Sequence, residues 1–413
     1  MPAELQIRSE RLLTELSELS NISAHPLPAV TRVLFSPEDM RARDWLRAKA
    51  VDAGLEFRSD AVGNLFIRLA GSDPGLPAVA TGSHTDAIPN AGAYDGTVGV
   101  LGGLEALRSI KESGFVPRRS IELIMFTAEE PTRFGIGCLG SRMLAGTTTA
   151  EQAAALKDSN GDGLESLRPA EYPGALESVR LPAGHYAGFV ELHIEQGPQL
   201  DAKGIDIGLV EKIAAPAAFR LNFTGTGGHA GAVLMPERHD AFLAAAETSL
   251  IVERAALESG SPDTVGTTGK VQVLPGAINS IPCEVMMEID FRDTDLTARD
   301  TAIERIRSEA ASVCARRGVS LEWSCINSDP PALCSQGILG IAETIAAGRG
   351  LTFTRMISRA YHDSLFMARI CPTAMLFIPC LNGWSHRPDE YASPEAIANG
   401  TSLLAATLME MSR

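Results

Sequence analysis

Continuous apolar runs alternate with helically spaced positions along much of the chain. The apolar runs cover residues 77–82, 121–126, 188–192 and 374–379, and each is followed by a polar loop that contains glycine. Runs of this length predict strands that are buried on both faces. Residues 98–113 between them have helical spacing. The pattern indicates an α/β fold around a mixed, largely parallel sheet, in which ligands bind beyond the carboxyl ends of the strands.

The middle of the chain has a different pattern. Residues 219–224 and 284–291 alternate in polarity, as strands with one exposed face do, and residues 239–258 have helical spacing. We predict a smaller α+β domain over residues 213–328, inserted into a larger domain of residues 1–212 and 329–413. A chain of 413 residues with 45% hydrophobic residues is long and apolar enough for two domains.

Leucines near the N-terminus predict an amphipathic helix rather than an export signal, because Leu12, Leu13, Leu16 and Leu19 stand at helical spacing. No apolar run approaches the roughly 18 residues that a membrane span needs. The net charge of −15 opposes binding to nucleic acids or anionic membranes, which would repel an acidic surface. We therefore expect a cytoplasmic protein that binds a small molecule and keeps its seven scattered cysteines reduced.

Two motifs suggest functions that their context does not support. Residues 158–163 begin like a calcium-binding loop, but the twelfth position is Pro169 where a bidentate glutamate is needed. We predict a turn there. Residues 225–230 imitate a dinucleotide-binding fingerprint, yet they lie among alternating strands and lack the surrounding βαβ unit. A nicotinamide cofactor is therefore not expected.

Histidines and acids gather after the predicted buried strands. Singly, each has a structural explanation: a hydrogen-bonded histidine, an Asp-Gly turn or a solvated pair of glutamates. Together they suit zinc, manganese or a related divalent ion, and a carboxylate shared by two ions would hold them about 3.5–4 Å apart. The glutamate pair is the strongest sign, because it follows a strand with no exposed face and is costly there without cations. The set is His84, Asp95, Glu129, Glu130, His193 and His386.

Eight stretches, spread over nearly the whole chain, carry a family resemblance. They are GSHTDAIPNAGAYDGTVGVLGGLEAL (82–107), FTAEEPTRFGIGCLGSRMLAG (126–146), ELHIEQGPQL (191–200), GTGGHAGAVLMPERHDA (225–241), PGAINSIP (275–282), IDFRD (289–293), SRAYHDSLFMA and PCLNGWSHRPDEYAS. In this order they resemble the M20 metallopeptidase family. The likeness is greatest to its ureido-acid branch, which includes allantoate and ureidoglycolate amidohydrolases, β-ureidopropionases and N-carbamoyl-L-amino acid hydrolases.

The resemblance implies two divalent metal ions per subunit, with manganese favoured and zinc, cobalt or nickel as alternatives. One ion would be held by His84, Asp95 and His193. The second ion would be held by Asp95, Glu130 and His386.

The resemblance also implies two catalytic acids beside these ligands. Glu129 would be the general base that takes a proton from the attacking water, since it stands next to a ligand without being one. Asp86, which we place on the same strand face as His84, would orient that imidazole through its carboxylate.

The inserted domain, by the same resemblance, makes a homodimer interface and closes over the site as a lid. His229 would stabilise the oxyanion in the partner's site, and Asn279 and Arg292 would hold a substrate carboxylate there. Gln196 would contact the ureido group. Without the resemblance, Asn279 would be taken as a turn residue and Arg292 as part of a surface ion pair.

The late motif bears on the substrate. Residues 359–364 read Arg-Ala-Tyr-His-Asp-Ser, where carbamoylases and allantoate amidohydrolases typically have Gly-Ala-Gly-His-Asp-Ala. This form resembles the ureidoglycolate amidohydrolases, and Tyr361 in place of glycine would shrink the pocket. His362 would contact the substrate or cap Asp363. We expect hydrolysis of the ureido C–N bond of (S)-ureidoglycolate to glyoxylate, ammonia and carbon dioxide.

Other functions remain as alternatives. The nearest is hydrolysis of N-carbamoyl-L-amino acids, followed by allantoate or β-ureidopropionate, and more distantly dipeptidase or aminoacylase activity. A binding protein that kept the fold without catalysis should have lost a ligand or the base, yet all six residues of the set are present. A metal assay distinguishes an enzyme from such a binder.

Overall fold

The computed structural model describes residues 5–413 and divides the chain into two compact units. The first unit comprises residues 1–211, 333–356 and 362–413, and the second comprises residues 212–332 and 357–361. The two long boundaries lie within a few residues of those expected. The short segment 357–361 differs, since we had assigned it to the larger domain. It groups with the second unit because Ser358 accepts a backbone hydrogen bond from Ala214 and Arg359 bonds to Asp263.

The first unit is built on a nine-stranded sheet in the order β15-β8-β17-β7-β4-β6-β3-β2, with β16 beside β8. Strands β17, β7, β4 and β6 are parallel, and the flanking pairs are antiparallel. The strands are β2 (Glu56–Ser59), β3 (Leu65–Leu69), β4 (Ala78–His84), β6 (Ile121–Phe126), β7 (Tyr186–Ile194), β8 (Ile207–Ile213), β15 (Ala332–Leu333), β16 (Phe353–Ser358) and β17 (Thr373–Ile378). The mixed, largely parallel α/β fold and its four buried central strands are confirmed.

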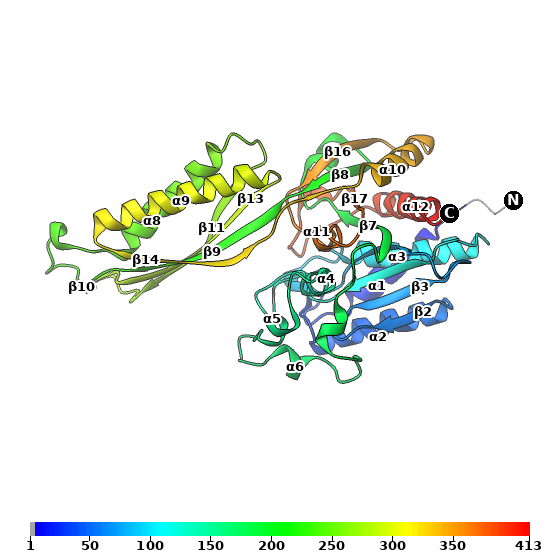
Figure 1. Ribbon diagram of the computed structural model, residues 1–413, viewed down its shortest axis with the longest axis horizontal. Coiled ribbons are helices and arrows are strands. Elements are labelled where there is room, and N and C mark those ends of the chain that lie inside the picture. Colours follow the sequence, from blue (N-terminus) through cyan, green and yellow to red (C-terminus); the bar gives the residue numbers. More distant parts are fainter. Residues whose placement is uncertain (1–4) are drawn as a thin grey trace. The chain divides into compact units, whose positions relative to one another are not determined.

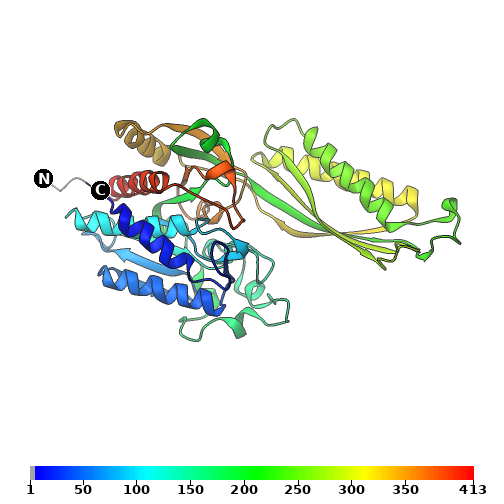
Figure 2. The same ribbon diagram turned by 180° about the vertical axis from the view of Figure 1, so that it is seen from behind.

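Helices cover both faces of this sheet (Figure 1). On one face, α3 and α12 pack against each other and the central strands, and α1 packs on both helices (Figure 2). On the other face, α4 packs on β6 and α11 on β7 and β17. The helices are α1 (Ser9–Ser20), α2 (Pro37–Asp52), α3 (Thr97–Glu112), α4 (Leu139–Ala145), α5 (Ala150–Ala154), α6 (Leu164–Leu167), α7 (Gln199–Lys203), α10 (Gln336–Gly348), α11 (Asp363–Met367) and α12 (Pro394–Met411), with 3-10 turns η1 (Leu176–Val179) and η3 (Leu381–Gly383).

Helix α3 lies close to the sheet. A Cβ atom on Gly99 would lie 2.4 Å from the backbone oxygen of Leu192 on β7, so glycine is needed there despite its poor helix propensity. A separate two-stranded antiparallel ladder joins β1 (Val30–Arg32) to β5 (Ala87–Ala91), and β5 follows β4 in the sequence.

The second unit is a four-stranded antiparallel sheet in the order β11-β13-β9-β14, with α8 and α9 packed on one face. Along β13, Val285, Met287, Ile289 and Phe291 are buried and the residues between them are not, which is why the sequence alternates. The elements are β9 (Ala215–Thr224), β10 (Gly228–His229), η2 (Met235–Glu237), α8 (Ala241–Leu257), β11 (Val265–Leu274), β12 (Ser280–Ile281), β13 (Glu284–Asp293), α9 (Leu296–Arg317) and β14 (Ser320–Ser328).

Several smaller predictions are also confirmed. The N-terminal leucines lie on α1, all seven cysteines are free, and Asp158 accepts hydrogen bonds from the backbone of Asn160 and Asp162 in a turn. Within residues 5–413, no helix combines the length and the apolar character that crossing a bilayer requires.

Candidate active site

The predicted metal ligands and the predicted general base converge at the carboxyl ends of the parallel strands. His84 is the last residue of β4, His193 is the penultimate residue of β7, Glu129 and Glu130 follow β6, and His386 follows β17. Because these four strands run in the same direction, their ends meet at one edge of the sheet. Sequence segments that are far apart therefore supply one site.

Side-chain alternation places the two strand histidines on the same face. Thr81 of β4 and Leu192 of β7 lie against glycines of α3. His84 and His193 are an odd number of residues away, so they point to the opposite face, which α4 and α11 cover.

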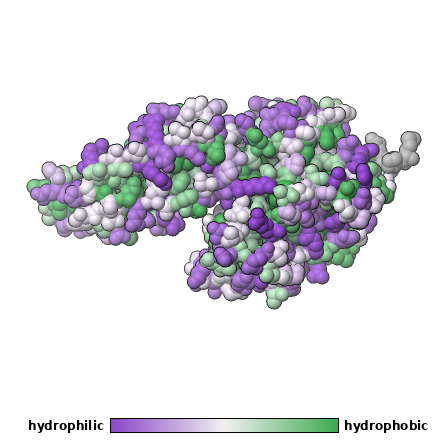
Figure 3. All heavy atoms as spheres, viewed as in Figure 1, coloured by the Kyte–Doolittle hydropathy of each residue, from purple (hydrophilic) through white to green (hydrophobic). Residues whose placement is uncertain are grey.

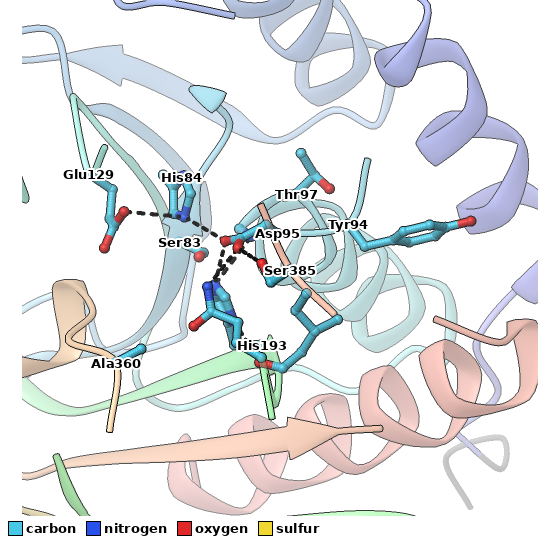
Figure 4. A network of polar contacts seen from close by, with 12 residues as sticks. Ser83, His84, Tyr94, Asp95, Thr97, Glu129, His193, Ala360 and Ser385 are labelled. Carbon is cyan, nitrogen blue, oxygen red and sulfur yellow. Dashed lines mark hydrogen bonds and ion pairs between the residues drawn. The ribbon is translucent and has the colours of Figure 1, made fainter. Parts of the chain in front are cut away.

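Asp95 lies at the centre of the cluster. Its Oδ1 is 3.4 Å from Nε2 of His84 and 3.3 Å from Nε2 of His193. Its Oδ2 is 3.5 Å from Nε2 of His386, which in turn lies 3.2 Å from Oε1 of Glu130. Figure 4 shows His84 and His193 turned toward Asp95. The two carboxylate oxygens thus face two separate sets of donors.

Hydrogen bonds favour one tautomer of the neutral form in both strand imidazoles. Nδ1 of His84 donates to the backbone oxygen of Asp86 at 3.0 Å, and Nδ1 of His193 donates to that of Ile194 at 2.9 Å. A neutral imidazole held in this way keeps an unprotonated Nε2, which is the atom that a metal ion binds. The backbone N–H of Gly96 approaches Nε2 of His193 at 3.2 Å, which agrees with an acceptor there.

Gly96 leaves space in front of the imidazole of His84. Its φ angle is +66°, and a Cβ atom would lie 2.4 Å from Nε2 of His84. Any other residue would occupy the volume in front of the imidazole, so glycine is required by both the turn and the site.

Buried negative charge shifts the ionisation of the cluster. Burial lowers the pKa of His84, but Glu129, Asp95 and Asp86 outweigh this effect and raise the pKa well above its ordinary value. The pKa of His386 is raised to about 9, first by its hydrogen bond to Glu130. Four acids, Asp86, Asp95, Glu129 and Glu130, are buried within this small volume. Such a donor set fits two divalent cations, which would compensate the charge.

Glu129 does not belong to either donor set. Its Oε2 lies 3.7 Å from Nε2 of His84, and its Oε1 accepts a long hydrogen bond of 3.5 Å from the thiol of Cys138. Burial raises the pKa of Glu129 well above its ordinary value, His84 lowers it and Glu130 raises it further. Cys138 was not predicted, since nothing in the sequence indicates that residues 138–140 pair with the backbone of residues 127–129.

Asp86 is placed differently from our expectation. Strand β4 ends at His84, so Asp86 lies beyond the strand and shares no strand face with that histidine. Its carboxylate is 3.7 Å from Nδ1 of His84, whereas its backbone oxygen makes the hydrogen bond. The carboxylate instead accepts hydrogen bonds of 3.3 and 3.0 Å from the backbone N–H groups of Glu129 and Glu130. Asp86 therefore supports both glutamates as well as the imidazole.

Two further residues that the sequence did not indicate contact Asp95. The hydroxyl of Ser385 bonds to its Oδ2, and Glu390 accepts its backbone N–H at 2.9 Å. Burial raises the pKa of Glu390 to about 7, and the charge of Asp95 contributes. Isolated loop residues of these types are common, so the sequence offered no signal for either.

Two of the expected substrate residues lie beside the cluster. Nε2 of Gln196 donates to Oδ2 of Asp95 at 2.6 Å, and its Oε1 is buried without a hydrogen-bond partner. The ring of His362 is buried, with its centroid 4.5 Å from that of His193. Asp363 accepts a hydrogen bond of 2.5 Å from Ser141.

The other three lie in the second unit and do not form one cluster. The backbone of Ala230, next to His229, bonds to Asn279 where β10 and β12 pair. Arg292 is near the opposite end of β13, where its guanidinium bonds to both carboxylate oxygens of Asp290 and lies 5.8 Å from the ring of Tyr361. Along β13, Glu284 at one end and Arg292 near the other are separated by roughly 27 Å at the usual rise per residue.

A protein-family model matches most of the chain. The model described as peptidase family M20/M25/M40 matches residues 80–410, which include the residues of both donor sets. The chain belongs to this family. The expected family is thus confirmed.

Individual members of the family differ in their similarity to the chain. A ureidoglycolate hydrolase from Oryza sativa subsp. japonica is 53% identical over 98% of this chain and 85% of its own length. An N-carbamoyl-L-amino acid amidohydrolase from Geobacillus stearothermophilus is 36% identical over 98% of this chain and 99% of its own length. The crystal structure of AtUAH in complex with (S)-hydroxyglycine is 50% identical, covers 99% of this chain and 98% of that chain, and has a TM-score of 0.90.

Proposed function

We propose that the protein is a two-ion amidohydrolase that hydrolyses the ureido C–N bond of a small ureido acid, with (S)-ureidoglycolate as the first candidate. The observation that carries this proposal is Asp95, whose two oxygens face His84 and His193 on one side and His386 on the other. A carboxylate in this position is suited to bridge two ions.

The two donor sets would hold the ions. His84, Asp95 and His193 form one set, and Asp95, Glu130 and His386 form the other. When bound, such ions polarise the scissile carbonyl and activate the attacking water. Manganese is favoured and zinc, cobalt or nickel are alternatives, because imidazole and carboxylate donors do not select sharply among them.

Glu129 is the general base of the proposed reaction. It takes a proton from the attacking water and returns it to the departing nitrogen. Its carboxylate lies outside both donor sets, with Oε2 3.7 Å from Nε2 of His84, so it stands beside the proposed ions, where a base must lie. Asp86 accepts hydrogen bonds from the backbone N–H groups of Glu129 and Glu130, and so holds the segment that carries this base.

The overall reaction consumes one water and releases ammonia, carbon dioxide and hydroxyglycine. Water adds to the ureido carbon as the terminal C–N bond breaks, and the carbamate that remains loses carbon dioxide. Hydroxyglycine then eliminates its amine as a second ammonia and leaves glyoxylate. The solved relative with bound (S)-hydroxyglycine supports this product.

The substrate choice rests on similarity and on charge. The relative named ureidoglycolate hydrolase is considerably more similar to the chain than the carbamoyl amino acid amidohydrolase is. Arg292 and Asn279 are proposed to hold the substrate carboxylate, Gln196 and His362 to contact the ureido end, and His229 to stabilise the oxyanion. N-carbamoyl-L-amino acid hydrolysis is the less favoured alternative.

A homodimer is proposed because one copy of the second unit cannot present all its candidate residues to one small acid. Arg292 is roughly 27 Å from the His229 and Asn279 end of the sheet, several times the length of ureidoglycolate. We propose that Arg292 serves the site of one subunit, and that His229 and Asn279 of the same chain serve the site of the other.

Helix α8 offers a surface for such an interface. Leu243, Leu250 and Leu257 recur every seven residues and are 37, 63 and 81% exposed. This spacing forms one apolar stripe along the helix. Figure 3 shows hydrophilic and hydrophobic residues intermixed over the face of the second unit that is in view. A stripe of this kind supports a contact between two copies.

A substrate panel tests the proposed function. Ammonia release is measured with ureidoglycolate, allantoate, N-carbamoyl-β-alanine, several N-carbamoyl-L-amino acids and a dipeptide. We expect the highest kcat/KM with ureidoglycolate. A tenfold preference for a carbamoyl amino acid, about 1.4 kcal/mol in transition-state free energy, would reject the substrate but leave the two-ion chemistry. A cytoplasmic location stays a prediction.

A further inference from the structure

The buried carboxylate of Glu390 connects two loops of the site. Its Oε1 accepts hydrogen bonds of 2.7 and 2.9 Å from the backbone N–H groups of Tyr94 and Asp95. Its Oε2 lies 3.0 Å from the hydroxyl of Ser385, which also contacts Oδ2 of Asp95 and can donate its one proton to only one of the two carboxylates at a time. The side chain is almost fully buried, and these three groups are its hydrogen-bond partners.

The contact is built into the backbone of the first loop. A Cβ atom on Gly92 would lie 2.3 Å from Cβ of Glu390, so the close approach requires glycine at position 92. The same loop carries Asp95. The loop from which Glu390 projects carries Ser385 and His386. Glu390 therefore joins the segment that supplies the shared carboxylate to the segment that supplies the third histidine.

We propose that Glu390 is a positioning residue that fixes Asp95 relative to His386 and thereby sets the affinity of the second donor set, Asp95, Glu130 and His386. This inference rests on the proposed two-ion function. Glu390 acts through its neighbours. Its Oε1 contacts the backbone N–H of Asp95, and its Oε2 contacts the hydroxyl of Ser385, the residue before His386.

The first donor set depends less on Glu390. His84 and His193 belong to paired strands, and a backbone carbonyl holds Nδ1 of each. His386 belongs to a loop, has a φ angle of +60°, and its side chain is 46% exposed. Without Glu390, two ligands of the first ion stay fixed by the sheet, whereas the geometry between Asp95 and His386 is lost.

Three substitutions separate the hydrogen bonds from the charge. Glu390→Ala removes all three bonds, and Glu390→Asp keeps the charge on a shorter arm that cannot reach both loops. Glu390→Gln keeps the acceptor for the two N–H groups, and its amide can donate to Ser385. The control is Glu105→Gln, which alters a carboxylate that is equally buried but bonds to Arg8, Arg11 and Ser109 away from the site.

The experiment measures Mn²⁺ binding to the metal-free full-length protein by calorimetric titration, with electron paramagnetic resonance to detect coupled ion pairs. We expect two ions and a coupled spectrum for wild type, Glu105→Gln and Glu390→Gln. We expect Glu390→Ala and Glu390→Asp to bind one ion normally and the second 10- to 100-fold more weakly, as for other groups that orient metal ligands. Their spectra should then be those of isolated ions at limiting metal.

Several outcomes would overturn the inference while leaving the proposed function. These are unchanged affinity for both ions in Glu390→Ala and Glu390→Asp, equal weakening of both ions, or a Glu390→Gln variant as defective as Glu390→Ala. If a thermal-unfolding measurement shows that Glu390→Ala is not folded, Glu390→Asp and Ser385→Ala decide between these outcomes. A wild-type protein that binds fewer than two ions would instead contradict the proposed function itself.

Discussion

Oδ2 of Asp95 lies 3.5 Å from Nε2 of His386, although the two residues are far apart in the sequence. With Oδ1 of Asp95 facing His84 and His193, this contact makes one carboxylate common to two donor sets. Each side chain alone is an ordinary loop or strand-end residue. Their convergence at the edge of the parallel sheet is what supports a pair of ions.

The first prediction is that activity requires a divalent metal. Exhaustive dialysis against a chelator should abolish ammonia release from ureidoglycolate, and Mn²⁺ should restore it. The apparent melting temperature should rise when metal is added back, because ions that bind the native state stabilise it. Full activity in demonstrably metal-free protein would contradict the proposal.

The second prediction concerns the base. Glu129→Gln should keep both ions but lower kcat by about 10²- to 10⁴-fold, since an amide cannot accept the proton. Metal content and kcat are measured together. Glu122→Gln is the control. Glu122 lies on β6, the strand that leads to Glu129, and its buried carboxylate bonds to Tyr186 and Arg58 instead of facing the site. A normal rate for Glu129→Gln would mean that another group is the base.

The third prediction concerns the carboxylate of the substrate. Arg292→Lys should lower kcat/KM for ureidoglycolate at least tenfold, or about 1.4 kcal/mol, because an ammonium cannot form the bidentate pair that a guanidinium forms. The structure shows that the Arg292 fork has this capacity, since it binds both oxygens of Asp290. Arg220→Lys, which changes a similar fork on Glu288, should have no comparable effect. Equal losses in the two variants would argue against substrate binding by Arg292.

The fourth prediction concerns shared sites. A mixture of inactive His229→Ala and inactive Glu129→Gln proteins should regain activity after subunit exchange, because one hybrid site then has both residues. Ammonia release and exchange are measured on the same sample. Activity that stays absent after verified exchange would mean that the sites are not shared.

The α8 stripe tests the same dimer by another route. Leu250→Glu should shift the protein toward monomer in analytical ultracentrifugation, since it puts a charge in the middle of the stripe. Val116→Glu alters a similarly exposed apolar residue of the first unit and should leave the assembly unchanged.

The sequence predicted those parts of the fold and site that have a local signal. Strands such as β4 and β6 do not alternate in polarity because both of their faces are buried, and β13 alternates because one face is not. His84 and Glu129 could be placed near one another because parallel strands end at a common edge.

Other features have no local signal. Glu390 and Cys138 contact the site only because loops fold back on it, and nothing in their neighbours' types indicates this. Segment 357–361 contacts the second unit through hydrogen bonds to residues far away in the sequence, such as Ala214 and Asp263. The separation of Arg292 from His229 follows from strand register, which one sequence does not reveal.

The place of β17 in the sheet has a consequence for biosynthesis. It lies between β8 and β7, both of which precede it by more than a hundred residues in the chain. Until β17 leaves the ribosome, the facing edges of β7 and β8 have no strand between them, and such open edges readily pair with other chains. The sheet therefore closes only when synthesis is nearly finished. A frameshift or proteolytic cut shortly before residue 373 should yield an aggregating fragment rather than a weakened enzyme.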